Sequence, residues 1–315
     1  MSARARTAAV TALLMVATAC GPSAPLQVGV KEINTDVLIG PPERLGRIVL
    51  PPGSGPIIGF PGIVEPPVIP VPPEPGRAVE CPAVDPLATV AHPITAAVTK
   101  PPVAAAYTFR DDGVYTIGAK RGALPKTSIR RVGNIQHDAS GDSFTFDVAI
   151  PGPLGLVTTT TYHVYPDQPN PVDPTPGIYI DQTVITQPGK QPRTFTPVPS
   201  LELLQFPASP GVSWSARGVD PSSQTVMGYD ATITRKDIVD ACGTKVEAWV
   251  VDISNGTVTN PIANTNVSFQ MSIEIAPQYG GLSVLDKLNR TGTEQGEPVS
   301  TVNTSRITSE PKVPS

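Results

Sequence analysis

The sequence predicts a mainly β protein, in which an antiparallel and strongly curved sheet, either a half-barrel or a β-sandwich, follows a proline-rich extended segment. The first observation behind this class is the alternation of apolar and polar residues, with the period of a strand, over much of residues 103–290. The second is the proline content, 39 of 315 residues, because proline fixes φ and lacks the N–H donor that helices and inner strands need.

Residues 1–19 have the pattern of an export signal. Arg4 and Arg6 precede a short apolar stretch, and small residues follow it. The next residue closes the tetrapeptide Ala-Thr-Ala-Cys at Cys20. This tetrapeptide resembles the lipobox of bacterial lipoproteins, although Ala17 stands where that family usually has leucine. The resemblance implies cleavage before Cys20, acylation of its thiol with palmitate-type chains, and anchoring to the outer face of the bacterial cytoplasmic membrane. An ordinary secretory signal that leaves a plain thiol is the alternative.

Residues 20–102 are expected to form a lipid-anchored, proline-rich linker. Prolines favour an extended polyproline-II conformation, with a rise of about 3.1 Å per residue, which suits a stalk. Recognition by a proline-binding module is the alternative. The segment also contains apolar residues such as Ile57, Phe60 and Val68, so we expect part of it to pack against the folded domain.

The chain has three cysteines. If Cys20 is acylated, Cys81 and Cys242 remain as an even pair in an oxidising compartment. This count predicts a disulfide that joins the end of the linker to the domain. Two buried thiols are the alternative.

Residues 103–290 are expected to form the antiparallel β domain. The alternation is clearest at 143–150, where Phe144 and Phe146 share one face with two aliphatic residues. The other predicted strands are 158–165, 177–185, 212–216, 225–234, 246–253 and 267–275.

Turn-forming residues separate these strands. The clusters at 138–142 and 254–256 predict hairpin turns. A short helix is expected at 200–204, where Ser200 provides an N-cap and Pro207 ends the segment.

The parts 103–190 and 200–290 both contain alternating strands around a polar turn, which makes a duplication a candidate. Residues 291–315 are expected to form a polar C-terminal tail, to which 299–307 could add an edge strand.

Glycine and tryptophan positions in the second half of the chain carry one family resemblance. They are Gly211-Val212-Ser213-Trp214, Ala241-Cys242-Gly243 and Gly280-Gly281-Leu282. With them, residues 206–288 resemble a poorly characterised group of bacterial envelope β-domains. The resemblance implies a strongly curved antiparallel sheet, similar to lipid-handling half-barrels, and it brings no catalytic residue.

The charge of the chain argues against two kinds of partner. Removal of residues 1–19 takes Arg4 and Arg6 from the 23 basic residues, which leaves 21 against 27 acidic ones and a net charge of −6. Nucleic acids and anionic lipid headgroups both require basic surfaces. We therefore expect no nucleic acid partner, and we expect the lipid anchor alone to hold the membrane. The high Ala, Val, Arg and Pro content is typical of a GC-rich genome and suggests an actinobacterium.

The residues that could support chemistry are few. His92, His137 and His163 are the three histidines, and none has the spacing of a metal site. Nucleophile-elbow, phosphate-loop and dinucleotide motifs are missing from the sequence, and 138–142 offers too few ligands for a calcium loop. We therefore predict a non-catalytic protein without cofactor or metal.

Three functions remain open, in decreasing order of expectation. The first is a non-catalytic cell-surface lipoprotein with a binding or structural role in the bacterial envelope, its partner an envelope protein or glycan. The second is a carrier of a lipid or other apolar ligand in a concave sheet; its candidate ligand face comprises Trp214, Trp249, Phe144 and Phe146. The third is an envelope hydrolase, which would use His137 or His163.

Overall fold

The computed structural model describes residues 81–85, 87–95, 100–137, 141–150, 156–165, 175–186 and 191–314. These residues belong to one compact unit. The predictions of an export signal, of lipidation at Cys20 and of a proline-rich stalk concern residues 1–80 and lie outside the described part. Asp138, in the predicted turn 138–142, lies outside it as well.

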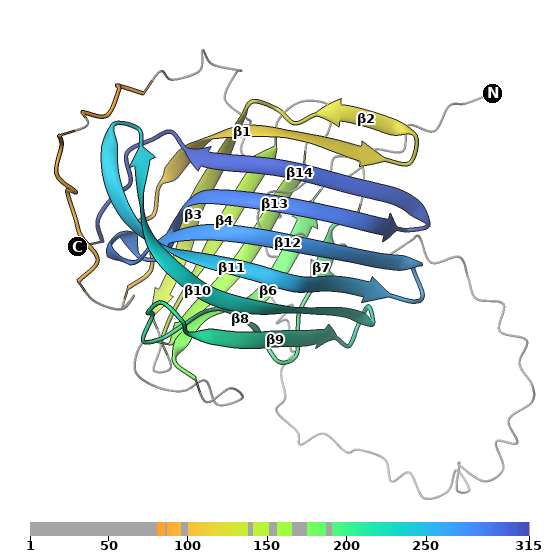
Figure 1. The fold of residues 1–315 in the computed structure, drawn as a ribbon. Helices are drawn as coiled ribbons and strands as arrows, with labels where there is room; N and C mark the ends of the chain where they lie inside the picture. The colour runs from red at the N-terminus through yellow and green to blue at the C-terminus, as the bar shows by residue number, and fades with distance from the viewer. Residues whose placement is uncertain are drawn as a thin grey trace, which may run out of the picture. The chain divides into compact units, whose positions relative to one another are not determined.

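A single sheet of 14 strands contains most of the described residues (Figure 1). The strands are β1 (Ala106–Ile117), β2 (Lys120–Ala123), β3 (Thr127–His137), β4 (Asp142–Ile150), β5 (Leu156–Tyr165), β6 (Gly177–Thr186), β7 (Arg193–Phe195), β8 (Leu201–Gln205), β9 (Ser213–Asp220), β10 (Thr225–Ala241), β11 (Thr244–Asn260), β12 (Thr265–Ala276), β13 (Leu282–Glu294) and β14 (Glu297–Ile307). Neighbouring strands pair antiparallel throughout. The predicted mainly β, antiparallel fold class is confirmed.

The strand order brings the first and last strands of the domain together in the middle of the sheet. It runs β7-β6-β5-β4-β3-β1-β14-β13-β12-β11-β10-β9, with β2 beside β1 and β8 beside β6. In Figure 1, β9–β14 form the near layer and β3–β6 cross behind it. Side chains of β4 and β5, such as Phe146 and Tyr162, share one cavity wall with Ile273 and Leu282 of β12 and β13. The apolar core therefore lies between the two layers.

The two ends of the sheet meet and nearly close it. Val198 and Val219 exchange two backbone hydrogen bonds, with N–O distances of 2.9 and 3.1 Å. Beside them, the carbonyl oxygen of Glu202 accepts hydrogen bonds from Trp214 Nε1 and from the Tyr229 hydroxyl, both at 2.8 Å. These contacts join β8 and the residues just before it, which lie beside β6 near one end of the strand order, to β9 and β10 at the other end.

The predicted helix at 200–204 is wrong, because residues 201–204 lie in β8. Leucines and glutamate favour helices by propensity, but β8 pairs with β6 from Ile180↔Leu201 to Gly177↔Gln205. Four of the five residues of β8 are buried. Pairing and burial thus override a weak local preference.

The predicted hairpin turn at 254–256 is also wrong, because these residues lie inside β11. The register with β12 shifts between Ile253 and Gly256, and Asn255 has a φ of 50°. A Cβ on Gly256 would lie 2.5 Å from the Phe269 ring. Residues that tolerate left-handed conformations serve turns and β-bulges alike, and here they form a bulge.

The C-terminal residues are not a peripheral tail. The segment predicted as an optional edge strand is β14, which lies between β13 and β1 and pairs with both. Its inward positions include Thr301, Asn303 and Ser305, all of them buried. Because these side chains are polar, the segment lacks the apolar alternation that marks a core strand in a sequence.

Candidate functional site

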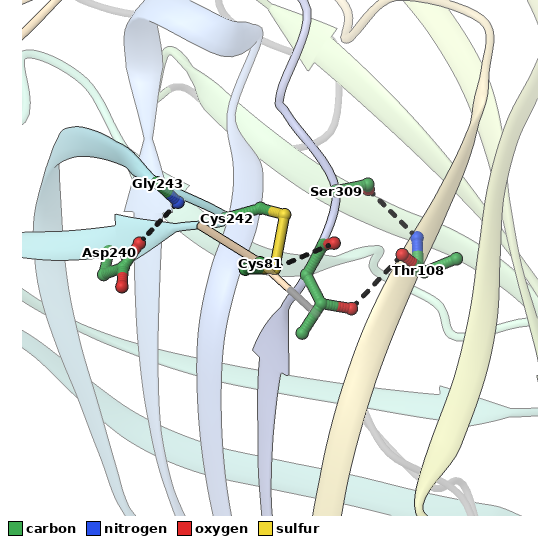
Figure 2. The surroundings of a disulfide bond; sticks show 7 residues. Cys81, Thr108, Asp240, Cys242, Gly243 and Ser309 are labelled. Atoms are coloured by element: carbon green, nitrogen blue, oxygen red, sulfur yellow. Dashed lines mark hydrogen bonds between the residues drawn. A yellow bond between two sulfur atoms is a disulfide. The ribbon is translucent and has the colours of Figure 1, made fainter. Parts of the chain in front are cut away.

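The disulfide between Cys81 and Cys242 lies at one corner of the domain (Figure 2). The two Cα atoms are 4.7 Å apart, although the residues are 161 positions apart in sequence. Cys242 and Gly243 form the two-residue turn between β10 and β11, with φ values of 54° and 86°. Positive φ at both positions is the geometry of a type I′ hairpin turn. The Gly243 N–H donates to Asp240 Oδ1 at 2.8 Å and holds this turn in place.

Three distant segments meet at this corner. Cys81 Sγ lies 3.3 Å from the carbonyl oxygen of Thr308, just after β14. The N–H of Thr308 donates to the Thr108 carbonyl at 2.7 Å, and the Thr108 N–H donates to Ser309 Oγ at 3.0 Å. The bridge therefore connects the residues before β1, the β10–β11 turn and the C-terminal end of the sheet, as Figure 2 shows.

The residues after Cys81 pack along the tip of the β10–β11 hairpin. His92 forms a parallel β-bridge with Val246, and its ring meets that of Tyr279 edge-on at 5.8 Å. The Ile94 N–H donates to Glu247 Oε2 at 2.8 Å. This bond, with the Lys236 ammonium at 3.0 Å, lowers the pKa of the Glu247 carboxyl. The C-terminal part of the predicted linker is thus structurally part of the domain.

The four residues of the predicted ligand face lie in or against one apolar core. Phe144 and Phe146 are buried and line a cavity of about 30 Å³ with Tyr162. Trp214 is buried in the same core cluster and donates to the Glu202 carbonyl, and half-buried Trp249 packs against that cluster. A cavity of this size holds one or two water molecules, whereas ligand pockets are roughly 300–1,000 Å³. This cavity is therefore too small to hold a lipid.

Two histidines have carboxylate neighbours. His137 Nδ1 lies 2.6 Å from Asp142 Oδ1 on the surface, and His163 Nδ1 lies 3.6 Å from Asp181 Oδ2. Ser200 Oγ donates to Asp181 Oδ1 at 2.8 Å. In this trio the carboxylate stands between the hydroxyl and the imidazole. A serine nucleophile instead requires the imidazole in the middle, as the base that takes its proton.

A buried polar network crosses the interior from β3 to β13. Arg130 Nη1 donates to Asp286 at 2.5 Å, and Arg130 Nη2 donates to Ser305 Oγ at 2.5 Å. The Ser305 hydroxyl in turn donates to Asp111, and Ser283 donates to Asp286. The Arg130 guanidinium also stacks 3.7 Å above the Phe109 ring. Sequence reasoning missed this network, because its members lie on four strands that only the fold brings together.

The described residues contain no cluster of three or more His, Cys, Asp or Glu side chains that could bind a metal ion. Within the same ranges, no helix has both the length and the apolar character that crossing a bilayer requires.

Comparisons with known proteins identify no family for this chain. No model of a known protein family matches the chain, and no curated protein sequence matches it. One matching solved structure is described as a "putative lipoprotein" from Parabacteroides distasonis, with 9% sequence identity and a TM-score of 0.36, over 69% of this chain and 99% of that one. A likeness this low carries no argument. The resemblance of residues 206–288 to envelope β-domains thus remains a prediction.

Proposed function

We propose that this protein is a non-catalytic lipoprotein of the bacterial cell envelope. Acylated at Cys20, it is anchored to the outer face of the cytoplasmic membrane. It presents its β domain to the envelope in a binding or structural role. The observation that carries this proposal is the Cys81–Cys242 disulfide.

The disulfide supports the proposal in two ways. Structural disulfides persist in oxidising compartments and are rare in the cytosol, so the bridge agrees with the export signal in residues 1–19. The bridge also uses two of the three cysteines. It leaves Cys20 outside the pair, at the position where a lipoprotein signal requires a cysteine.

The arrangement of polar groups supports a non-catalytic role. Arg130, Asp286 and Ser305 are buried and bond to one another. In the group of Ser200, Asp181 and His163, the serine hydroxyl bonds to the carboxylate and not to the imidazole. Neither set presents a base-activated nucleophile.

The test is the location of the protein after Cys20→Ala. The wild type should be in the membrane fraction and should incorporate labelled palmitate, whereas Cys20→Ala should appear in the medium without label. A matched control is Cys81→Ser with Cys242→Ser, which removes the other two cysteines and should keep both anchor and label. A Cys20→Ala protein that stays in the membrane or keeps the label would contradict the proposal.

A further inference from the structure

One row of residues crosses the outer face of the sheet at the level of the disulfide corner. Register places Glu274 of β12 opposite Leu285 of β13, Leu285 opposite Arg306 of β14, and Arg306 opposite Arg110 of β1. Glu274 and Leu285 are buried, whereas both arginines are exposed. The next outward pair towards the corner is Thr308 and Thr108, which bond to each other.

Arg110 and Arg306 face each other with the same charge. Directly opposite residues have Cβ atoms about 4.5–5.5 Å apart, and like charges there destabilise a sheet. Neither guanidinium makes a hydrogen bond or an ion pair with any residue that the structure describes. The acid nearest to Arg110 on the outer face of β1 is Asp112, which is paired with Lys126 at 2.9 Å.

Lys287 of β13 adds a third cation beside this pair. It is exposed and lies opposite Thr304, two residues from Arg306, so it is a diagonal neighbour of Arg306. Like the two arginines, Lys287 has no hydrogen bond or ion pair within the described ranges. Thr304 lies on the same face, between Lys287 and Asp112 of β1.

The carboxylates around this group do not neutralise it. Glu274 is buried, and burial raises its pKa, with Asp237 adding to the increase and Lys287, Arg235 and Arg306 opposing it. Asp237 is itself paired with Arg235 at 3.3 Å. Asp112, opposite Thr304, is an exposed carboxylate on this surface, but it is paired with Lys126, so Arg110, Lys287 and Arg306 have no salt bridge to a described residue.

We propose that Arg110, Lys287 and Arg306 form a binding site for a phosphate group of an envelope ligand. Guanidinium groups bind phosphate oxygens through paired, charge-assisted hydrogen bonds, and an ammonium adds a point charge. The anion would also remove the repulsion between the facing arginines, which explains why this pairing is tolerated. The ligand is a phosphate ester in the aqueous envelope rather than a bilayer surface, because a site of three cations on a chain of net negative charge matches one phosphate group better than a charged plane.

This site deepens the proposed function. Only the statement that the ligand comes from the envelope rests on that function. The full exported chain with Cys20→Ala is titrated with inorganic pyrophosphate in a calorimeter at low ionic strength. Saturable binding is expected, and each of Arg110→Ala and Arg306→Ala should weaken it roughly tenfold, as expected for loss of one charge-assisted hydrogen bond. Arg217→Ala is the matched control, since Arg217 is exposed in β9, the last strand of the sheet order and distant in that order from the row, and it should leave binding unchanged.

A second arm measures cosedimentation of the same chain with phosphatidylglycerol vesicles. No binding, or binding that pyrophosphate displaces, agrees with a site for one phosphate group. The proposal is overturned if pyrophosphate does not bind saturably, if Arg217→Ala weakens binding as much as Arg306→Ala, or if vesicles bind and pyrophosphate does not compete. Thermal melting shows that the variants are folded, and Arg110→Ala should melt no lower than its parent. Because binding is measured without the anchor, its failure is distinct from a failure of the lipidation test.

Discussion

Arg130 is the side chain on which the interior polar groups converge. Its side chain and that of Asp286 are 0% and 3% exposed, whereas the Lys126–Asp112 pair on the outer face is 70% and 74% exposed. A buried ion pair that loses one partner leaves an uncompensated charge in a medium of low dielectric constant. An exposed pair that loses one partner exposes the other to water, which solvates it.

Arg130→Met should therefore destabilise the domain by about 3–5 kcal/mol, read as a lower urea midpoint with an unchanged slope. Lys126→Met is the matched control and should shift the midpoint little. The double variant Arg130→Met with Asp286→Leu should be more stable than Arg130→Met alone, because it removes the stranded carboxylate. If the double variant were no more stable than Arg130→Met, the loss of stability would come from lost packing of the arginine side chain and not from the unpaired charge of Asp286.

Tyr162 and Tyr229 make stability depend on alkaline pH. Burial raises the pKa of both phenols, and the carboxylates of Asp286 and Glu202 respectively add to the increase. A group whose pKa is higher in the folded state stabilises it fully below the unfolded value of about 10. This stabilisation is lost as the pH rises above that value. The urea midpoint should consequently fall as the pH rises above about 10, and Tyr162→Phe should flatten the decline. If the urea midpoint of Tyr162→Phe fell equally with pH, groups other than Tyr162 would cause the pH dependence.

At the scale of an element, the turn after the 3-10 segment Pro277–Tyr279 is fixed by close packing. Gly280 has a φ of 73°, and a Cβ there would collide with the backbone of Pro101 and Pro102. Gly211 has a φ of 91°, and a Cβ there would meet nothing within 4 Å. The two glycines share backbone strain and differ in the space around them.

Gly211→Ala should cost about 1–2 kcal/mol, the strain of a left-handed residue with a Cβ. Gly280→Ala should cost a further 1–3 kcal/mol or so, because the residues before β1 must move. Chemical denaturation of the two variants measures the difference. Equal losses of stability in the two variants would mean that the Pro101–Pro102 segment moves away from the added Cβ without a measurable cost.

The elements also show what a sequence of this kind can reveal. β4 and β12 were predicted because their core-facing positions are apolar and alternate with polar ones. β14 was placed at an edge because Thr301, Asn303 and Ser305 face the polar part of the interior, where alternation of hydrophobicity disappears. The phosphate site was invisible to sequence reasoning, since only strand register brings Arg110 beside Arg306.

At the scale of the whole domain, the disulfide should be the largest single contribution to stability. It closes a loop of 161 residues, for which chain entropy predicts at most about 5 kcal/mol. Cys81→Ser with Cys242→Ser should lower the urea midpoint by a corresponding amount. Reduction of the wild type should add two hydrogens to its mass and reproduce that shift. A mass that reduction leaves unchanged would exclude the bridge in the purified protein.

The same bridge decides how a pulling force enters the domain. A pull transmitted from residue 80 passes through the sulfur atoms to Cys242, so the load reaches the turn between β10 and β11 before it reaches β1. All the chain between the two cysteines is bypassed and cannot lengthen while the bond is oxidised. A domain pulled between its N-terminal tether and its C-terminal end would thus lengthen only through β11 to β14, by loss of their strand hydrogen bonds, while the segment between the cysteines stays closed.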